Sequence, residues 1–359
     1  MLCGACLEAC PRNLDTPQLV ITVRSQLPGL SGLSFLKYVS RKALVHPSLL
    51  SGLTRIGTAA NLLLGGWLPQ DSGLRLRLQG FEQEAFKLPA RGYIEKLKAE
   101  LPEDKERQES EANSGMSFFA GCLANHLQPE IAESTQLLVA KTTGCKADVP
   151  LEQTCCGMAA LAAGRIDEAR DLARKYIMAF EANDFPILTS CSSCYFQLKT
   201  YEELFADDRE WLLRARRFSA RLKEFSVFFY ENMADGQAAA ARESSSEHRV
   251  FYHDPCHLRH KLKITRQPRN LLKLLNGVQL QELAGGPQCC GQGGLFQVAH
   301  PELALQVRDR LLEDFSGLEV DTVVTGCSGC LLQWQIGLAA RHQKIRAEHL
   351  AVFIARLLQ

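Results

Sequence analysis

A pattern of five cysteines occurs twice in this chain of 359 residues. In each copy a single cysteine is followed, after 32 residues, by an adjacent pair, and a C-x-x-C motif follows the pair after 34 residues in the first copy and 36 in the second. Cysteines kept only for packing have no reason to recur at matched intervals, so the repeat predicts duplicated metal chemistry. The first set consists of Cys122, Cys155, Cys156, Cys191 and Cys194, and the second of Cys256, Cys289, Cys290, Cys327 and Cys330.

Charge and hydropathy are those of an ordinary globular protein. Hydrophobic residues make up 46% and charged residues 23% of the chain, and 41 basic against 40 acidic side chains leave a formal net charge of +1. This balance argues against a nucleic-acid surface, and we expect no nucleic-acid partner. The most apolar stretch, residues 49–68, is interrupted by Arg55 and is a poor candidate for a membrane-spanning helix.

The cellular compartment decides how so many cysteines are used. Disulfides persist in oxidising compartments, whereas thiolates held for metal belong to reducing ones. The first residues of the chain carry Cys3, Cys6 and Cys10 and do not resemble a secretory signal. We therefore expect a cytoplasmic protein whose cysteines bind metal, and leave open a peripheral attachment to the inner face of the cytoplasmic membrane.

Composition divides the chain into three regions. Residues 1–113 combine a cysteine-rich stub with apolar, helical-looking stretches and end in a charged linker. Residues 114–235 form the first cysteine module, and residues 249–359 form the second, beyond a polar linker.

Both modules have the same order of predicted elements. A short β-type run leads to the single cysteine, a helical stretch follows at 129–143 or 266–276, and a second run at 146–151 or 278–283 leads to the pair. Another helix and a third β-type run then precede the C-x-x-C motif. This alternation predicts an α/β fold with a small parallel sheet in each module. Because sites gather at the carboxyl ends of parallel strands, each cysteine set should converge on one sheet edge.

The ligand set favours iron–sulfur clusters over zinc. Thiolates select zinc, copper(I) or iron–sulfur clusters, and a structural zinc site usually takes four ligands. Each module offers five cysteines, and an adjacent pair hardly chelates one tetrahedral ion but can reach two irons of a cluster. Gly157 and Gly291 follow the two pairs, where we expect the backbone to turn or to approach a cluster closely.

The N-terminal stub carries a different motif. Cys3, Cys6 and Cys10, followed by Pro11, reproduce the last three cysteines of the bacterial ferredoxin run C-x2-C-x2-C-x3-C-P. The missing first cysteine would stand one position before Met1, which suggests that the sequence begins inside the motif, by truncation or a misplaced start. We predict that these three cysteines are metal ligands of an incomplete ferredoxin-type cluster.

Other residues near the sets have less specific roles. Cys145 has no counterpart in the second module and is predicted to be a buried structural thiol. His253 and His257 flank Cys256, and either orient the cysteines and handle protons or simply cap a loop. Asp254 is expected to cap a helix or turn.

Taken together, FFAGC, QTCCG, YHDPCHL, QCCG and TGCSGC resemble the cysteine-rich "CCG" domains of the heterodisulfide reductase B and D subunits. The same domain pair is found in the glycolate oxidase iron–sulfur subunit, the anaerobic glycerol-3-phosphate dehydrogenase C subunit and related lactate-oxidation proteins. The resemblance covers residues 116–359, and the partial ferredoxin motif with the helical region behind it matches the same arrangement. The departure lies at the N-terminus, where the first ferredoxin motif is absent.

The resemblance implies an electron-transfer subunit of an oxidoreductase. An FAD-containing partner would oxidise a glycolate- or lactate-type 2-hydroxy acid, and the chain would pass the electrons toward a membrane quinone or another redox subunit. The chain itself has no dinucleotide-binding fingerprint, so the hydride chemistry must belong to the partner. The alternative is a catalytic subunit like that of heterodisulfide reductase, which cleaves a disulfide at a noncubane 4Fe–4S cluster. The resemblance also leaves zinc open for one module.

Overall fold

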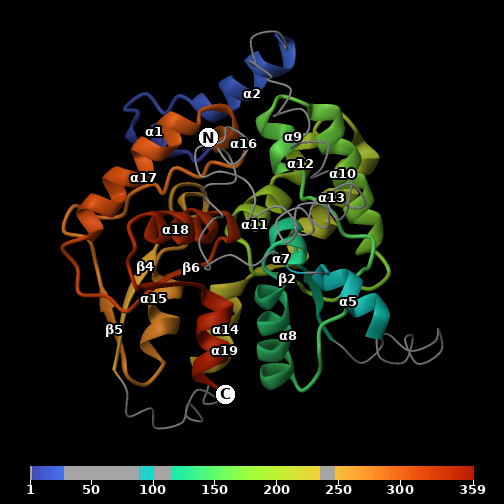
Figure 1. Ribbon diagram of the computed structural model, residues 1–359. Coiled ribbons are helices and arrows are strands. Elements are labelled where there is room, and N and C mark those ends of the chain that lie inside the picture. The colour runs from blue at the N-terminus through green and yellow to red at the C-terminus, as the bar shows by residue number, and fades with distance from the viewer. Residues whose placement is uncertain (1, 28–88, 90, 101–114, 235–246) are drawn as a thin grey trace, which may run out of the picture.

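The computed structural model describes residues 2–27, 89, 91–100, 115–234 and 247–359 (Figure 1). In these residues two small parallel sheets form, one in each half of the chain, and helices surround both. The predicted α/β class with two small parallel sheets is confirmed. The strands are β1 (Ser117–Phe119), β2 (Ile187–Thr189) and β3 (Leu222–Glu224) in the first sheet, and β4 (His248–His253), β5 (Val278–Gln281), β6 (Thr322–Thr325) and β7 (Arg346–His349) in the second.

The two sheets share one strand order. The first runs β1-β2-β3 and the second β5-β4-β6-β7, so that β1, β2 and β3 correspond to β4, β6 and β7. The strand predicted at 146–151 is wrong, because only Asp148 pairs with the first sheet, through a single bridge to Ser117. Pro150 explains the difference, since proline has no N–H group with which to continue a ladder. Asp148 thus holds the place that β5 takes in the second sheet.

The helices of the first module follow the predicted order. The expected helix at 129–143 is present with those bounds, and the helix after the cysteine pair buries the predicted face, including Ala169, Tyr176 and Ile177. The helices are α7 (Cys122–His126), α8 (Pro129–Thr143), α9 (Met158–Ala162), α10 (Ile166–Ala179), α11 (Ser192–Lys199), α12 (Tyr201–Leu204), α13 (Arg209–Arg221) and α14 (Phe225–Ala234).

The second module repeats this order with one irregularity. Directly after Cys256 the chain forms a π-helical turn, η4 (His257–Leu262), where the first module has the α-helix α7. Helices with π geometry are rare and occur often at functional sites. The other helices are α15 (Arg266–Lys273), α16 (Leu295–Ala299), α17 (Pro301–Phe315), α18 (Ser328–Ala340) and α19 (Leu350–Leu357).

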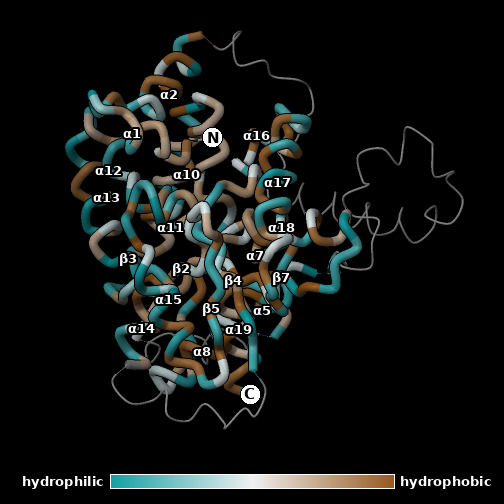
Figure 2. The backbone as a smooth tube through the Cα atoms, turned by 90° about the vertical axis from the view of Figure 1, so that its left-hand side faces the viewer, coloured by the Kyte–Doolittle hydropathy of each residue, from teal (hydrophilic) through white to brown (hydrophobic). Residues whose placement is uncertain are grey.

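The modules pack together through their last helices. Helix α14 of the first module lies against α15 of the second, and α19 of the second lies against α8 of the first (Figure 1). Lys141 at the end of α8 donates a hydrogen bond of 2.7 Å to the carbonyl of Leu358, just after α19. Each of the two large hydrophobic cores contains residues of both modules. In Figure 2 hydrophobic stretches of the chain gather in the interior of the molecule, with α19 among them. The two halves therefore bury their apolar surface together.

The described N-terminal residues connect to both modules. Glu8, on α1 (Ala5–Ala9), forms ion pairs with His260 and, at 2.9 Å, with Lys263 of the second module. On α2 (Thr16–Gln26), Arg24 donates a hydrogen bond of 2.6 Å to the carbonyl of Ala162 in the first module. Further on, α5 (Tyr93–Glu100) lies against α7 and α8.

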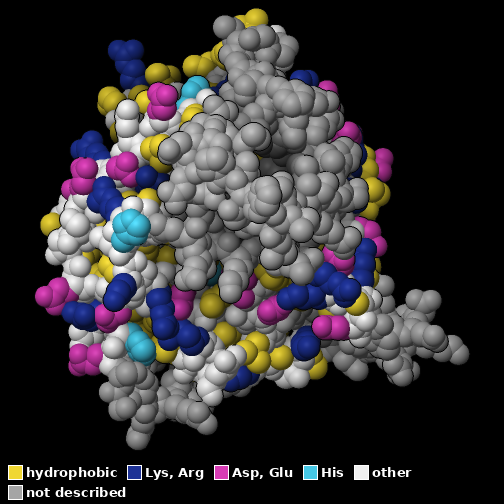
Figure 3. Space-filling model, viewed as in Figure 1, with side chains coloured by type: hydrophobic (Ala, Val, Ile, Leu, Met, Phe, Trp, Pro, Cys, Tyr) yellow, Lys and Arg dark blue, Asp and Glu magenta, His cyan; other side chains and the backbone are white. Residues whose placement is uncertain are grey.

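Two observations concern membranes and charge in the described part of the chain. Among the described residues, no helix is both long and apolar enough to cross a membrane. Residues 49–68 lie outside the described part of the chain, as do most of the predicted helical region and most of both linkers. On the described surface in Figure 3, basic and acidic side chains lie side by side, as the net charge of +1 suggests.

Candidate metal centre

The parallel strands bring each cysteine set to one sheet edge. In the first sheet Phe119 pairs with Thr189, so the chain leaves β1 and β2 at the same level and reaches Cys122 and Cys191. In the second sheet, the register between β4 and β6 does the same for Cys256 and Cys327. Each of these four cysteines stands at the start of a helix, where the backbone N–H groups favour a thiolate.

Glycine makes the turn that presents each cysteine pair. Gly157 and Gly291 follow the pairs with φ angles of +89° and +82°, in the left-handed region that only glycine adopts readily. At Gly291 a Cβ atom would also lie 2.5 Å from the carbonyl oxygen of Ala304, so the pair loop packs directly on α17. Of the two roles expected for these glycines, a turn or a close approach to a cluster, the structure shows the turn.

The thiols of the first set form a continuous hydrogen-bonded chain. Hydrogen bonds link Cys122 to Cys155, Cys155 to Cys156, Cys156 to Cys194 and Cys194 to Cys191. Hydrogen bonds from Cys122 and Cys156 hold the pKa of the Cys155 thiol well below its usual value. The pKa of Cys122 is raised by its hydrogen bond to Cys155 and by burial. The pKa of Cys194 is raised in the same way, by hydrogen bonds to Cys156 and Cys191 and by burial. Within this set the pKa of Cys155 is thus lowered, and the pKa values of the other four thiols, Cys122, Cys156, Cys191 and Cys194, are raised.

In the second set two thiols have a lowered pKa. The pKa of Cys290 is lowered by Cys289 and Cys330, and to a smaller extent by His253. The pKa of Cys327 is lowered by Cys191, Cys330 and Ser193. Two of these partners are not cysteines, which distinguishes the second set from the first.

All ten cysteines line one cavity of about 280 Å³ between the modules. Cys191 of the first set is hydrogen-bonded to Cys327 of the second, and the backbone N–H of Ser192 donates a bond of 2.9 Å to the carbonyl of Gly326. The remaining lining is largely apolar, with Leu123 and Met158 among the contributors. A cavity walled by thiols, with soft ligands from two sides, fits iron–sulfur clusters.

The three N-terminal cysteines are not brought together. Cys3 lines the cavity and is hydrogen-bonded to Cys256, which contributes most to lowering the pKa of Cys3 to about 5. Cys6 is exposed and Cys10 is partly exposed. Among the described residues, His253, Cys290 and Cys330 form the group of potential metal ligands whose ligand atoms all lie within 4.8 Å of one another. The ferredoxin-type role of Cys3, Cys6 and Cys10 stays a prediction.

Two predictions about neighbouring residues are wrong. Cys145 is exposed rather than buried, because it follows the left-handed Gly144 that ends α8 at the surface. It is not among the residues that line the cavity. Asp254 does not cap a helix or turn through its side chain; its carboxylate pairs with Arg269, at 2.6 and 2.8 Å.

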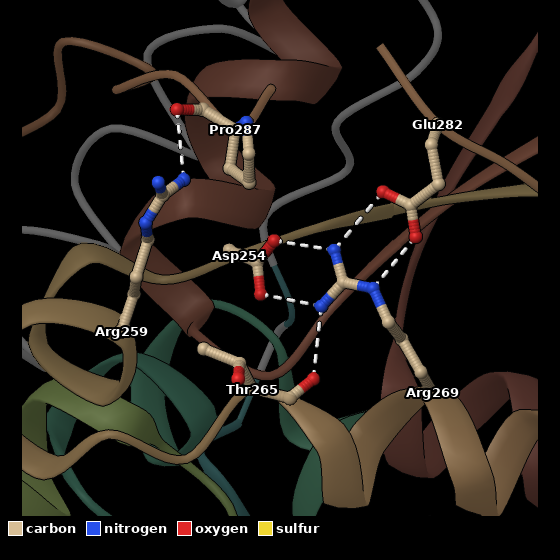
Figure 4. A network of polar contacts seen from close by, with 6 residues as sticks. All are labelled: Asp254, Arg259, Thr265, Arg269, Glu282 and Pro287. Atoms are coloured by element: carbon tan, nitrogen blue, oxygen red, sulfur yellow. Dashed lines mark hydrogen bonds and ion pairs between the residues drawn. The ribbon is translucent and has the colours of Figure 1, made fainter. Parts of the chain in front are cut away.

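This ion pair belongs to a network that holds the cysteine loops of the second module (Figure 4). The guanidinium of Arg269 lies between Asp254 and Glu282, and also donates a hydrogen bond of 2.9 Å to the carbonyl of Thr265. Asp254 stands two residues before Cys256, and Glu282 lies on the segment that leads to the cysteine pair. The network therefore ties the strand end that carries Cys256 to the loop that carries the pair.

The first module does the same with one neutral side chain. Gln153, two residues before Cys155, accepts a hydrogen bond of 2.9 Å from the N–H of Ala120 and donates one of 2.8 Å to the carbonyl of Phe118. Sequence reasoning missed Gln153, Arg269 and Ser193. For Gln153 and Ser193 the signal was adjacency to the cysteines, whereas nothing in the sequence pattern marks Arg269.

The fold and the cavity define a class: an α/β protein of two tandem cysteine-rich modules that share a thiol-lined cavity. The CCG cysteine-rich domain matches this chain twice, over residues 116–199 and 250–335. The chain belongs to this CCG cysteine-rich family.

Relatives match about two thirds of the chain or nearly all of it. A probable glycolate oxidase iron-sulfur subunit of Bacillus subtilis is 29% identical over 360 residues, which cover 97% of this chain and 79% of the relative. Lactate utilization protein A of Geobacillus kaustophilus is 31% identical over 236 residues, or 66% of this chain and 96% of the relative. The uncharacterized protein YkgE of Escherichia coli is 30% identical over 236 residues, with 66% and 97% covered.

Proposed function

We propose that this chain is the iron–sulfur subunit of a flavin-dependent 2-hydroxy acid dehydrogenase of the glycolate or lactate type. The observation that carries the proposal is the single cavity lined by both five-cysteine sets. Two relatives whose names are a glycolate oxidase iron-sulfur subunit and a lactate utilization protein support the substrate class.

Each five-cysteine set would hold one metal centre. Cys122, Cys155, Cys156, Cys191 and Cys194 would hold one 4Fe–4S cluster of the CCG type, and Cys256, Cys289, Cys290, Cys327 and Cys330 would hold the other. Such clusters, when bound, accept and release single electrons. The chain supplies the thiolates, fixes them on two sheet edges, and surrounds them with a mostly apolar wall.

The contact between Cys191 and Cys327 joins the two ligand sets. Electrons can therefore pass from one module to the other inside the protein. The hydroxy acid would be oxidised on an FAD-containing partner, which takes up two electrons, and the chain would pass them singly toward a quinone or another redox subunit.

The proposal is tested by mixing the iron-loaded chain with an FAD-containing glycolate or lactate dehydrogenase subunit. Glycolate or lactate should bleach the visible absorption of the clusters when both proteins are present, and not with the chain alone. An iron-loaded chain that stays oxidised in the presence of the reduced flavoprotein would overturn the proposal.

The cavity itself favours a second candidate, a subunit that reduces a disulfide as heterodisulfide reductase does. A disulfide substrate would need to approach the sulfur-lined wall, and would take up two electrons and two protons to give two thiols. Reduction of a disulfide by the iron-loaded chain with reduced methyl viologen would support this candidate. If no disulfide is reduced although the clusters are intact, this candidate is excluded and electron transfer remains as the proposed function.

A further inference from the structure

The surroundings of the two cysteine sets differ at equivalent positions of the duplicated scaffold. When the modules are aligned on Cys122 and Cys256, His253 takes the place of Phe119. The strand registers agree, because Phe119 pairs with Thr189 and His253 pairs with the equivalent Thr325. In the same alignment His257 takes the place of Leu123. Two apolar neighbours of the first set are thus imidazoles in the second.

A third difference lies inside the C-x-x-C motifs. Ser193 of the first module occupies the position that Gly329 has in the second. The Ser193 hydroxyl reaches across the interface and lies 3.3 Å from the Sγ atom of Cys327 and 3.0 Å from Nδ1 of His257. Gly329 has no side chain, so the second module offers no equivalent hydroxyl to the first set.

The chemistry of the contact decides its direction. A thiolate that ligates metal has no proton to give, so the hydroxyl of Ser193 donates to Cys327. Nδ1 of His257 then donates to the serine oxygen. The imidazole of His257 is buried and stacks on Phe196 with 4.8 Å between the ring centres, which holds this relay in place.

His253 adds a second polar neighbour to the same set. Its side chain is 2% exposed and packs against the indole of Trp334, with 5.6 Å between the ring centres. One of its ring nitrogens and the Sγ atoms of Cys290 and Cys330 lie within 4.8 Å of one another. Phe119, buried at the equivalent position, has no N–H or O–H group with which to donate a hydrogen bond.

We propose that the second set holds the centre of higher reduction potential, and that an added electron comes to rest there. Hydrogen bonds to the sulfurs of a cluster raise its potential, because they stabilise the extra negative charge of the reduced state. The step moves one electron, breaks no bond, and uses the reduced flavin of the partner, or dithionite in its place, as the donor. This inference rests on the proposed function, since it assumes that both sets hold clusters.

The test is a dithionite titration of the iron-loaded full chain, followed by electron paramagnetic resonance. Chains with Cys155→Ala or Cys289→Ala keep one cluster each and assign the two signals. Ser193→Gly should lower the potential of the second centre and leave that of the first unchanged, whereas Ser193→Thr, which keeps the hydroxyl, should retain it. His253→Phe should lower the second potential further.

Gly329→Ser is the reverse test, because it adds a hydroxyl at the position of the second module that is equivalent to Ser193. A Cβ at Gly329 would lie 3.4 Å or more from its nearest neighbours, with the Sγ atom of Cys327 at 3.9 Å among them, so a side chain can be placed there. We expect the duplicated scaffold to orient the new hydroxyl as it orients Ser193, toward the other set, and Gly329→Ser then raises the potential of the first centre. If the Ser193→Gly chain does not retain both clusters, the potentials of the Ser193→Ala and Gly329→Ser chains test the inference in its place. A first centre that is reduced before the second, or potentials that no variant moves, would overturn the inference alone. A chain that binds no iron would instead overturn the proposed function.

Discussion

The two modules have the same scaffold but hold their cysteines by different means. In the first, Gln153 joins the pair loop to β1 with two hydrogen bonds. In the second, Arg269 does so with a charged network between Asp254 and Glu282. The comparison teaches that strand order and register place the sulfurs, while the surrounding side chains are free to set different electrostatics. The pKa pattern also differs: neighbouring cysteines, with His253 and Ser193, lower the pKa of two thiols of the second set, Cys290 and Cys327, whereas only Cys155 is lowered in the first.

The largest expected effect separates the two sets as ligands. Cys156→Ala should remove the iron of the first module and leave the second loaded, and Cys290→Ala should do the reverse, so each variant keeps about half of the iron. Iron and acid-labile sulfide per chain measure this, with Cys145→Ser, at the exposed thiol, as the matched control that loses none. Unchanged iron in both pair variants would break the assignment.

The next prediction compares the side chains that hold the two pair loops, Arg269 in the second module and Gln153 in the first; we call each of them a clamp. Arg269→Met leaves the carboxylate of Asp254, whose side chain is 3% exposed, buried without its partner. This should cost about 3–5 kcal/mol of unfolding free energy. Gln153→Leu leaves two backbone groups unpaired in the first module and should cost less, about 1–3 kcal/mol. Urea denaturation measures both.

The double variant Asp254→Asn with Arg269→Met is the control for the clamp. It removes the buried charge as well as its partner, and should recover part of the lost stability. Equal losses in the single and double variants would show that the ion pair does not clamp the loops.

Two buried residues at equivalent strand ends should make the folding stability depend on pH in opposite directions. Glu224 ends β3 and His349 ends β7, each opposite the equivalent threonine of the neighbouring strand. Burial raises the pKa of Glu224 from 4.5 to about 7, so this residue lowers the stability as the pH rises from 4.5 to 7. Burial lowers the pKa of His349 from 6.5 to about 4, so this one lowers the stability as the pH falls from 6.5 to 4.

Matched variants sharpen this prediction. Glu224→Gln keeps an oxygen for the N–H of Val227 and should gain stability over the parent chain as the pH rises, by at most about 3 kcal/mol. His349→Gln should gain over the parent as the pH falls, by a similar amount. Denaturation curves at pH 4.5, 6 and 7.5 measure both, and parallel pH profiles in the parent and the variants would contradict the assignment.

The smallest effect concerns the two pair turns. Gly157→Ala places a side chain at positive φ, where its nearest contacts lie at an ordinary 3.7 Å, and should cost about 1–2 kcal/mol. Gly291→Ala has the same φ penalty and also meets the Ala304 carbonyl at 2.5 Å, so it should cost more. Thermal unfolding of the two variants compares them; a larger loss at Gly157 would contradict the packing described for the second pair.

Much of this arrangement could be predicted from the sequence. The cysteine spacing and the alternation of apolar runs with amphipathic stretches predict parallel sheets, with the cysteines at the strand ends. The prediction missed β3 and β7, because LKE and RAEH carry no hydrophobic alternation and become strands only through pairing with β2 and β6.

The shared cavity could not be predicted, because it depends on how the modules meet. Cys191 meets Cys327 only where the two modules pack together, and no periodicity within one module encodes that contact. Arg269 was missed for a similar reason, since its partners lie 15 and 13 residues away along the chain and meet it only in the folded module. Local patterns predict elements, whereas contacts between elements need the fold.

The most direct test is the metal content of the anaerobically purified full chain. Two five-cysteine sets that hold 4Fe–4S clusters predict a brown protein with roughly eight iron and eight acid-labile sulfide from these sets, and the Cys156→Ala and Cys290→Ala variants should each lose about four of both. A colourless protein with zinc and no acid-labile sulfide would contradict the account.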